Sequence, residues 1–262
     1  MKIAFFDSGI GGLSVLHHAI QILPDEQFVF FADEDNVPYG TKPREDVLKF
    51  VDDAFEFLLT LNVKAIVVAC NTATSVAVRA MRSKYNLPII GMEPAIKRAI
   101  DLYGDRRVLV TATPITVNGD KIKSLIDRIG KAQLIDLLAL PKLVEFSERQ
   151  EFNSEAVTTY LKDKFAPYDF TQFSSIVLGC THFNYFKDTI RAILPDNVKF
   201  VDGNSGTLRE LMRRLNLQLP EINNNKQPHI EFYFSGRKIT DPNELDRINN
   251  YLKRLDKMQS IN

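Results

Sequence analysis

Two stretches of the chain read alike: VVACNT at residues 67–72 and IVLGCTH at residues 176–182. Each begins as an apolar strand, reaches a small residue and a cysteine, and continues into polar residues that open a helix. A weaker echo pairs Lys2–Ser8 with Arg107–Ala112, each a strand that runs into a small or polar turn. A duplicated α/β unit explains both pairs of similar segments. Because ligands bind beyond the carboxyl ends of the strands in open α/β sheets, we expect the two cysteine loops to face one another across an interdomain cleft.

Strand patterns alternate with helical patterns along most of the sequence. β-branched or aromatic runs predict strands at Lys2–Phe6, Gln27–Ala32, Val63–Ala69, Pro88–Gly91, Arg107–Thr111, Ala132–Asp136, Ser174–Leu178, Val198–Asp202 and His229–Phe234. Such alternation is typical of βαβ units, whose sheets are mostly parallel and carry helices on both faces. We therefore predict an α/β fold of two pseudo-symmetric α/β domains.

Two helices and one loop are clearly marked. Apolar residues recur at three- and four-residue steps and predict one buried helix face, made of Val47, Leu48, Val51, Ala54, Phe55, Leu58 and Leu59. Near the C-terminus, Asp241 can cap a helix and Pro242 fits its first turn, with a buried stripe of Leu245, Ile248, Leu252 and Leu255. The segment Gln218–Pro228 is rich in asparagine and proline and predicts a loop.

The composition narrows the class of protein. The 262 residues include 33 Lys plus Arg and 33 Asp plus Glu, so there is no basic surplus to bind nucleic acid or an anionic membrane. No apolar stretch approaches the roughly 18 residues of a membrane span, and the N-terminus lacks a signal-peptide cleavage pattern. We expect a soluble, cytoplasmic protein. The two cysteines are too few for a disulfide framework and have no C-x-x-C spacing.

The turn DSGIGG at residues 7–12 has some features of a dinucleotide-binding fingerprint, and Asp33 stands where a ribose ligand is expected. The match fails because the third glycine position falls on Ser14, and because Asp7 precedes the turn where a pyrophosphate would approach. No Gly-Lys-Ser/Thr follows for a phosphate loop. The glycines still allow close backbone approach at a helix N-terminus, where a substrate carboxylate fits better than a nucleotide.

Cys70 and Cys180 have three possible roles. Each could be a small buried hydrophobe after a strand. However, both precede hydroxyl or amide residues at the first turn of a helix, where the dipole and free N–H groups lower the pKa of a thiol from about 8.5. A zinc site needs three or four ligands, and His182 alone is near a cysteine, since the other histidines are at positions 17, 18 and 229. We expect no metal.

Stereoinversion is the reaction that uses two thiols without a cofactor. Hydrolysis by a cysteine nucleophile needs one thiol, one histidine and an oxyanion hole, which leaves the second cysteine idle. Inversion at an acidic carbon needs a base on one face and a conjugate acid on the other, so two groups of like kind should flank the substrate. Asp7 and His182 are the candidates to hold or relay a proton for the thiols.

At these residues the sequence resembles the bacterial glutamate racemases, of the cofactor-independent aspartate/glutamate racemase superfamily. The matching motifs are, in the family's order, DSGIGG (7–12), VPYGTK (37–42), ACNTA (69–73), EPA (93–95) and GCTHF (179–183). The resemblance implies one domain of residues 1–94 and 207–262 and another of residues 95–206, with the site in the cleft between them. It also implies a homodimer that interconverts L- and D-glutamate without a cofactor, for peptidoglycan biosynthesis.

The resemblance also assigns roles to individual residues. It implies that Cys70 deprotonates D-glutamate with the help of Asp7, and that Cys180 deprotonates L-glutamate with the help of His182. Substrate binding is implied for Asp7, Ser8, Tyr39, Gly40, Asn71, Thr72, Thr181 and His182. Asp33 matches a further acidic position for the substrate ammonium, with a solvated strand-end carboxylate as the alternative.

Three departures from the family pattern leave assignments open. LVEFSE at residues 143–148 replaces a Phe-Val-Pro-x-Val-Glu run, so the assisting glutamate is Glu148 by its spacing to Cys180, or else Glu145. VTATPIT at residues 110–116 lacks the glycine of the usual Gly-Thr-x-x-Thr loop, so Thr113 or Thr116 contacts substrate, or the segment is a plain turn. Asn184 stands where proline is common and is expected to alter only the helix start.

Three other functions remain open at this point. A racemase of the same superfamily that acts on aspartate or a hydantoin differs in the size of its pocket. A nucleotide-dependent oxidoreductase would use the Gly9–Gly12 turn and co-purify with a nicotinamide. A two-lobed binding module would need neither thiol, so its affinity would survive replacement of either one by serine.

Overall fold

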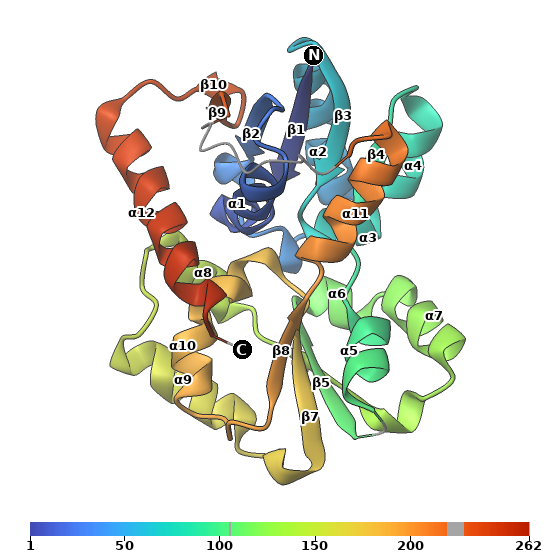
Figure 1. Ribbon diagram of the computed structural model, residues 1–262, viewed down its shortest axis with the longest axis vertical. Coiled ribbons are helices and arrows are strands. Elements are labelled where there is room, and N and C mark those ends of the chain that lie inside the picture. Colours follow the sequence, from blue (N-terminus) through green and yellow to red (C-terminus); the bar gives the residue numbers. More distant parts are fainter. Residues whose placement is uncertain (105, 219–227, 262) are drawn as a thin grey trace.

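The computed structural model describes residues 1–104, 106–218 and 228–261, which form two β-sheets and their covering helices (Figure 1). The first sheet has the order β10-β9-β2-β1-β3-β4 and is parallel except where β10 pairs with β9. Its strands are β1 (Lys2–Asp7), β2 (Phe28–Ala32), β3 (Val63–Val68), β4 (Ile89–Gly91), β9 (Ile230–Phe234) and β10 (Arg237–Lys238). The second sheet is parallel in the order β6-β5-β7-β8, with β5 (Arg107–Ala112), β6 (Ile135–Ala139), β7 (Phe173–Leu178) and β8 (Lys199–Asp202).

The two sheets repeat one topology. The order β2-β1-β3-β4 in the first corresponds to β6-β5-β7-β8 in the second. The pairing register even shifts at equivalent places, between Lys2 and Ile3 on β1 and between Arg107 and Val108 on β5. The structure therefore confirms the mostly parallel α/β fold and the duplication that the two cysteine stretches predict.

Helices and short 3-10 turns connect the strands. The helices are α1 (Leu13–Ile22), α2 (Arg44–Leu59), α3 (Asn71–Val76), α4 (Val78–Lys84), α5 (Ile96–Tyr103), α6 (Pro114–Asn118), α7 (Asp120–Ile129), α8 (Lys142–Glu148), α9 (Glu155–Phe165), α10 (Lys187–Arg191), α11 (Asn204–Leu215) and α12 (Pro242–Gln259). The 3-10 turns are η1 (Ile10–Gly12), η2 (Glu34–Asn36), η3 (Tyr39–Thr41), η4 (Ala132–Leu134), η5 (Phe170–Gln172) and η6 (Thr181–Phe186).

Each sheet buries both of its faces under helices. Successive side chains of a strand point to opposite faces, so neighbouring residues enter different cores. On β1, Phe5 packs in one core with α1, whereas Phe6 packs in another with α2. On β5, Leu109 packs with α9, and Val110 packs with α5. This burial on both sides explains why the strands read as apolar runs rather than as alternating patterns.

A few details differ from the sequence prediction. The strand predicted at Ala132–Asp136 begins only at Ile135, because Ala132–Leu134 forms η4. On α2, Leu48 and Leu59 are exposed, since the face turned toward the sheet is narrower than the full apolar stripe. Strand β10 is two residues long and has no pattern by which to predict it. The predicted loop Gln218–Pro228 lies outside the described residues except at its two ends.

The C-terminal segment returns to the first sheet and then crosses toward the second. β9 pairs with β2, and α12 packs against α1 of the first half and η6 of the second (Figure 1). Asp241 caps α12 as predicted, by accepting hydrogen bonds from the N–H groups of Asn243 and Glu244. The buried face is Ile248, Tyr251, Leu255 and Met258, while the predicted Leu245 and Leu252 are half-buried.

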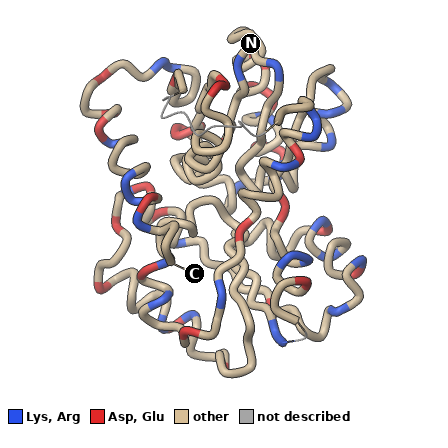
Figure 2. Tube along the Cα trace, viewed as in Figure 1, with Lys and Arg blue, Asp and Glu red and all other residues tan. Residues whose placement is uncertain are grey.

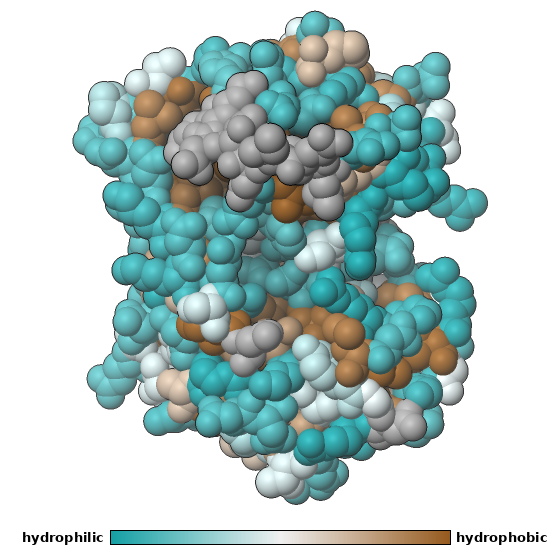
Figure 3. Space-filling model, in the orientation of Figure 1, coloured by the Kyte–Doolittle hydropathy of each residue, from teal (hydrophilic) through white to brown (hydrophobic). Residues whose placement is uncertain are grey.

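Charged residues of both signs are interspersed along both halves of the chain (Figure 2). The face drawn in Figure 3 is mostly hydrophilic and is hollowed between the upper and lower halves. None of the helices in the described parts of the chain combines the length and the apolar composition that a bilayer span requires.

Candidate active site

The carboxyl ends of the central strands of the two sheets meet, and this brings the two cysteine loops together. Asp7 ends β1, and Cys70 is the second residue after β3. From the other half, Thr181 donates a hydrogen bond from Oγ1 to Asp7 Oδ2 at 3.0 Å. The hydroxyls of Thr72 and Thr113, also from opposite halves, lie 2.8 Å apart. The Cys180 loop therefore contacts the end of β1, the Cys70 loop contacts the turn after β5, and the halves are in direct contact there.

The sequence-predicted residues come from both halves of the molecule. The first half supplies Asp7, Ser8, Asp33, Tyr39, Gly40, Cys70, Asn71 and Thr72, all of them buried. The second supplies Thr113, Cys180, Thr181 and His182, also buried, and the half-buried Glu148. Glu145, the alternative to Glu148, is exposed on the outer face of α8.

Cys70 lies at the end of a chain of polar contacts. Its Sγ is 3.6 Å from Ser8 Oγ, and Ser8 donates to Asp7 Oδ1 at 3.3 Å. Asp7 Oδ1 also accepts the N–H of Gly9 at 3.1 Å. Cys70 is the N-cap of α3, where its sulfur accepts the N–H of Ala73 at 3.3 Å. This chain offers a path for a proton from the thiol through the serine hydroxyl to the carboxylate.

Burial has the largest effect on the pKa values of Asp7 and Cys70, the two ends of this row of hydrogen-bonded groups. It raises the pKa of Asp7 to about 6, against the opposing effects of His182 and of the hydrogen bonds from Gly9 and Thr181. Burial, followed by the charge of Asp7, also raises the pKa of the Cys70 thiol to about 12. The sequence prediction of a lowered pKa is wrong for Cys70. The N–H of Ala73 does favour the thiolate, but α3 has only six residues and its effect is smaller than the cost of desolvation.

Cys180 is accompanied by a histidine and a glutamate. Its Sγ lies 3.8 Å from His182 Nδ1, and His182 Nε2 lies 2.6 Å from Glu148 Oε1. Burial opposes a charge on the ring, but the hydrogen bonds and charges of Cys180 and Glu148 outweigh it and raise the pKa of His182 well above 6.5. When it is protonated, the ring can donate to the sulfur from Nδ1 and to the carboxylate from Nε2, and Nε2 also lies 3.3 Å from the backbone nitrogen of Gly11.

Glu148 also joins the two halves. The same Oε1 atom accepts the N–H of Ile10 at 3.0 Å, at the start of η1. The contact is so close that a Cβ placed on Gly9 would lie 2.0 Å from Oε1. A Cβ on Gly11 would lie 2.4 Å from His182 Nδ1. The glycines of the DSGIGG turn thus make room for the side chains of the opposite half, and those side chains fill the space where a nucleotide pyrophosphate would approach.

Further polar groups line the same region. Thr113 Oγ1 donates to Thr116 Oγ1 at 3.1 Å, and a Cβ on Gly40 would lie 2.6 Å from the Cβ of Thr113. The side-chain oxygen of Asn71 is buried and accepts no hydrogen bond from the residues that the structure describes. An acceptor of this kind requires a donor from a ligand or from water. These groups are suited to a small, polar ligand with several charged groups.

Three contributors were missed by sequence reasoning. Ile10 acts through its backbone N–H, and the Tyr185 hydroxyl donates to the Ile10 carbonyl at 2.9 Å. Ser235 donates to Asp33 from a hairpin turn about 200 residues away in sequence. Tyr185 and Ser235 belong to no motif, and Ile10 lies inside DSGIGG but acts through a backbone group that its side chain does not reveal. Asn184 was expected to alter only the helix start, but its amide donates to the Thr181 carbonyl at 3.3 Å and so supports the turn that carries His182.

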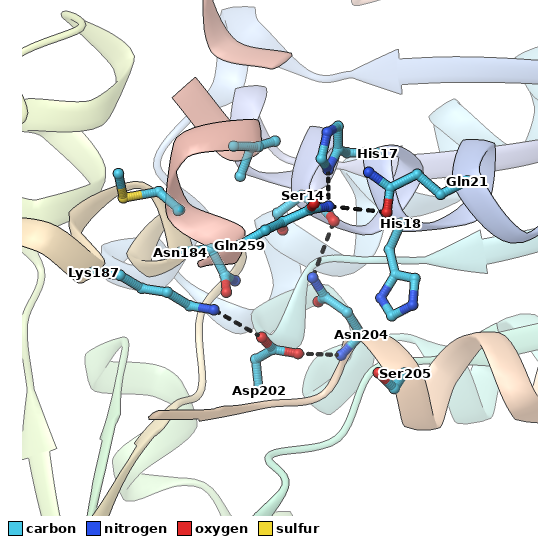
Figure 4. Close-up of a pocket in the computed structure, with 12 residues that line it drawn as sticks. Ser14, His17, His18, Gln21, Asn184, Lys187, Asp202, Asn204, Ser205 and Gln259 are labelled. Atoms are coloured by element: carbon cyan, nitrogen blue, oxygen red, sulfur yellow. Dashed lines mark hydrogen bonds and ion pairs between the residues drawn. The ribbon is translucent and has the colours of Figure 1, made fainter. Parts of the chain in front are cut away.

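A polar cavity of about 260 Å³ lies behind η6, between α1, α11 and α12 (Figure 4). His17 contacts Asp256 and Gln259 there, and Lys187 is 3.7 Å from Asp202. Neither cysteine lines this cavity. Within the described ranges there is no cluster of three or more histidine, cysteine or acidic side chains with the geometry of a metal site.

Comparison with known proteins agrees with this geometry. The family described as Asp/Glu/Hydantoin racemase matches residues 13–211. The chain is 50% identical to a glutamate racemase of Campylobacter concisus, and the alignment covers 100% of both chains.

Two solved structures are also similar. The glutamate racemase of Campylobacter jejuni has a TM-score of 0.81 at 25% identity, covering 97% of this chain and 98% of that one. The glutamate racemase of Francisella tularensis in complex with D-glutamate has a TM-score of 0.77 at 28% identity, covering 96% and 92%. With a family match over three quarters of its length and a relative of this identity along its whole length, the chain belongs to the Asp/Glu/hydantoin racemase family.

Proposed function

We propose that the protein is a glutamate racemase, which interconverts L- and D-glutamate by exchanging protons between the substrate α-carbon and the thiols of Cys70 and Cys180. The observation that carries the proposal is the arrangement of the thiols. They come from equivalent loops of a duplicated fold, each with its own partners able to hold a proton. The full-length relative and the solved structures named glutamate racemase support glutamate as the substrate.

On the Cys70 side, the thiolate removes the α-proton of D-glutamate from one face, while the Cys180 thiol donates a proton to the other face. The products are L-glutamate, a protonated Cys70 and a Cys180 thiolate, so protons and charge balance. Ser8 and Asp7 then return the Cys70 proton to solvent or hold it for the reverse reaction. The α-ammonium of a bound substrate favours the thiolate and offsets the raised pKa of Cys70.

On the Cys180 side, the thiolate removes the α-proton of L-glutamate. The His182 imidazolium, held by Glu148, stabilises that thiolate and can resupply its proton. We assign the assisting role to Glu148 rather than to Glu145, since Glu148 lies against the ring.

The substrate is held by groups from both halves. In this proposal the backbone N–H groups at Tyr39 and Gly40 bind the carboxylates. The hydroxyls of Ser8 and Thr181 already donate to Asp7, and that of Thr113 donates to Thr116, so these oxygens and the unpaired Asn71 oxygen offer lone pairs to the ammonium. Thr72 shares its hydrogen bond with Thr113 at the same place. Fixed donors on the carboxylate stabilise the negative charge that develops when the α-proton leaves. Closure of the two halves excludes the water that would weaken this effect.

Several broader assignments follow from the proposal. We place residues 1–94 and 207–262 in one domain and 95–206 in the other, because β9 pairs with β2 and α11 packs on α1 and β4. We also propose a homodimer that acts in the cytoplasm and supplies D-glutamate for peptidoglycan. Aspartate is the second candidate substrate, whereas a nucleotide oxidoreductase conflicts with a DSGIGG turn covered by Glu148 and His182.

Proton exchange in D₂O tests the activity. Incubation with either L- or D-glutamate is expected to remove the α-proton signal in NMR and to end in a racemic mixture, because each thiol carries solvent deuterium. L-aspartate is the matched control and should exchange at least ten times more slowly, since its shorter side chain cannot keep both carboxylates on their donors. No exchange with either enantiomer of glutamate under reducing conditions contradicts the proposal.

The raised pKa of Asp7 predicts the acid limb of the pH profile. Asp7 must be ionised to accept a proton from Cys70 through Ser8, so kcat/KM is expected to fall about tenfold per pH unit below pH 6. The two enantiomers have equal free energies, so kcat/KM is the same in both directions and one profile serves for both. A profile that is flat from pH 5 to pH 8 would show that Asp7 takes no part in proton transfer.

The close approach at Gly9 tests whether the closed arrangement is the active one. Gly9→Ala places a methyl group against Glu148 and is expected to lower kcat/KM at least tenfold by holding the halves apart. Gly206→Ala is the control, because a Cβ at that position in α11 meets nothing within 4 Å and should leave kcat/KM unchanged. Full activity of Gly9→Ala would mean that Glu148 need not contact the turn.

A further inference from the structure

Asp33 makes contacts that differ from those expected of a group that binds the substrate ammonium. It is buried directly after β2 and accepts four hydrogen bonds from side chains. Tyr39 donates its hydroxyl to Oδ2 at 2.6 Å, and the Asn36 amide lies at 3.0 and 3.1 Å from the two oxygens. Ser235 donates its hydroxyl to Oδ1 at 2.8 Å. The carboxylate is therefore already surrounded by donors from the protein, and it is not solvated.

These contacts determine the orientation of the Tyr39 hydroxyl. Its proton points to Asp33, and burial followed by the charge of Asp33 raises the pKa of Tyr39 above its usual range, so that the phenol stays protonated. Tyr39 belongs to the same buried cluster as Cys70 and is followed by Gly40, which touches Thr113 of the opposite half. Because its proton is donated to Asp33, the hydroxyl can offer a lone pair but no proton to any further group.

Ser235 connects this network to the C-terminal hairpin of β9 and β10. Its hydroxyl accepts the N–H of Asp35 at 3.1 Å while it donates to Asp33, and its own N–H donates to the Ala32 carbonyl at 2.8 Å. The backbone at Ser235 has a φ of +44°, a left-handed conformation that costs a serine more than a glycine. Glycine would fit this backbone with less strain, but it would lack the hydroxyl. The two hydrogen bonds of that hydroxyl, to Asp35 and Asp33, both reach the loop that carries Tyr39.

We propose that Ser235 is a positioning residue of the active site, which holds Asp33 so that Asp33 fixes the place and the polarity of the Tyr39 hydroxyl. On this assignment Asp33 does not bind substrate directly, and the C-terminal hairpin completes the binding site of the first half. The role given to Tyr39 is to accept a hydrogen bond from the substrate ammonium. This part rests on the proposed racemase function.

The test is a double-mutant cycle on the full chain. Ser235→Gly removes the hydroxyl and relieves the strained backbone, so its melting temperature is expected to stay within about 2 °C of the wild type while KM for both enantiomers rises about fivefold. Tyr39→Phe is expected to raise KM at least as much. In the Tyr39→Phe background, Ser235→Gly should change KM less than twofold, because its effect passes through the same hydroxyl. Lys238→Ala, in the same hairpin but on the surface, is the control and should leave KM unchanged.

A second readout does not depend on activity. In protein labelled with ¹³C at the tyrosine ring carbon that bears the hydroxyl, the Tyr39 signal, assigned with Tyr39→Phe, is expected to shift in Ser235→Gly and not in Lys238→Ala. Three results would overturn the inference: KM effects that multiply, a KM effect that follows a loss of melting temperature, or an unmoved Tyr39 signal. A wild type that exchanges no α-proton would instead refute the racemase function, and the Tyr39 signal would still decide whether Ser235 positions that residue.

Discussion

The carboxylate of Glu148 is the interaction on which the site depends. One of its oxygens accepts both the backbone N–H of Ile10 from the first half and the ring nitrogen of His182 from the second. That contact joins the halves at the DSGIGG turn and, together with Cys180, raises the pKa of His182. It also explains Gly9, where any side chain would collide with the carboxylate. A single group thus connects the contact between the halves to the ring that lies beside Cys180.

The two thiols have unlike surroundings although the loops that carry them are equivalent. Cys70 shares a buried space with Asp7, so its negative charge is opposed by desolvation and by a carboxylate. Cys180 lies beside His182, whose pKa is raised by Cys180 and by a second carboxylate, Glu148. In the closed site, where water does not screen charges, these differences are large compared with the pull of a short helix. The Cys70 thiol therefore stays protonated in the absence of a ligand, whereas the sulfur of Cys180 lies beside the His182 ring.

Much of the fold was predictable from sequence, and most of the residues singled out as site candidates are buried near the carboxyl ends of the strands. The repeated strand–cysteine–helix stretches predict the duplicated topology, and they predict that Cys70 and Cys180 face each other. Because the strands are buried on both faces, they can be predicted from their apolar runs. The start of one strand was predicted too early, at Ala132, because a 3-10 turn of similar composition precedes it. The direction of the Cys70 pKa was not predictable, because it depends on how deeply the thiol is enclosed. Ile10 and Ser235 were missed for a related reason. Ile10 acts through its backbone N–H, so its side chain within DSGIGG does not reveal the role, and Ser235 acts through a fold that brings distant residues together.

The central claim is that both thiols take part in every conversion, one on each face of the substrate. The most direct measurement is the rate of optical change of L- and of D-glutamate with Cys70→Ser and with Cys180→Ser, each checked for wild-type folding by circular dichroism. Because a serine hydroxyl is a far weaker acid than a thiol, racemisation is expected to fall at least about a thousandfold in both variants and in both directions. A rate within tenfold of the wild type in either variant would contradict the two-thiol account.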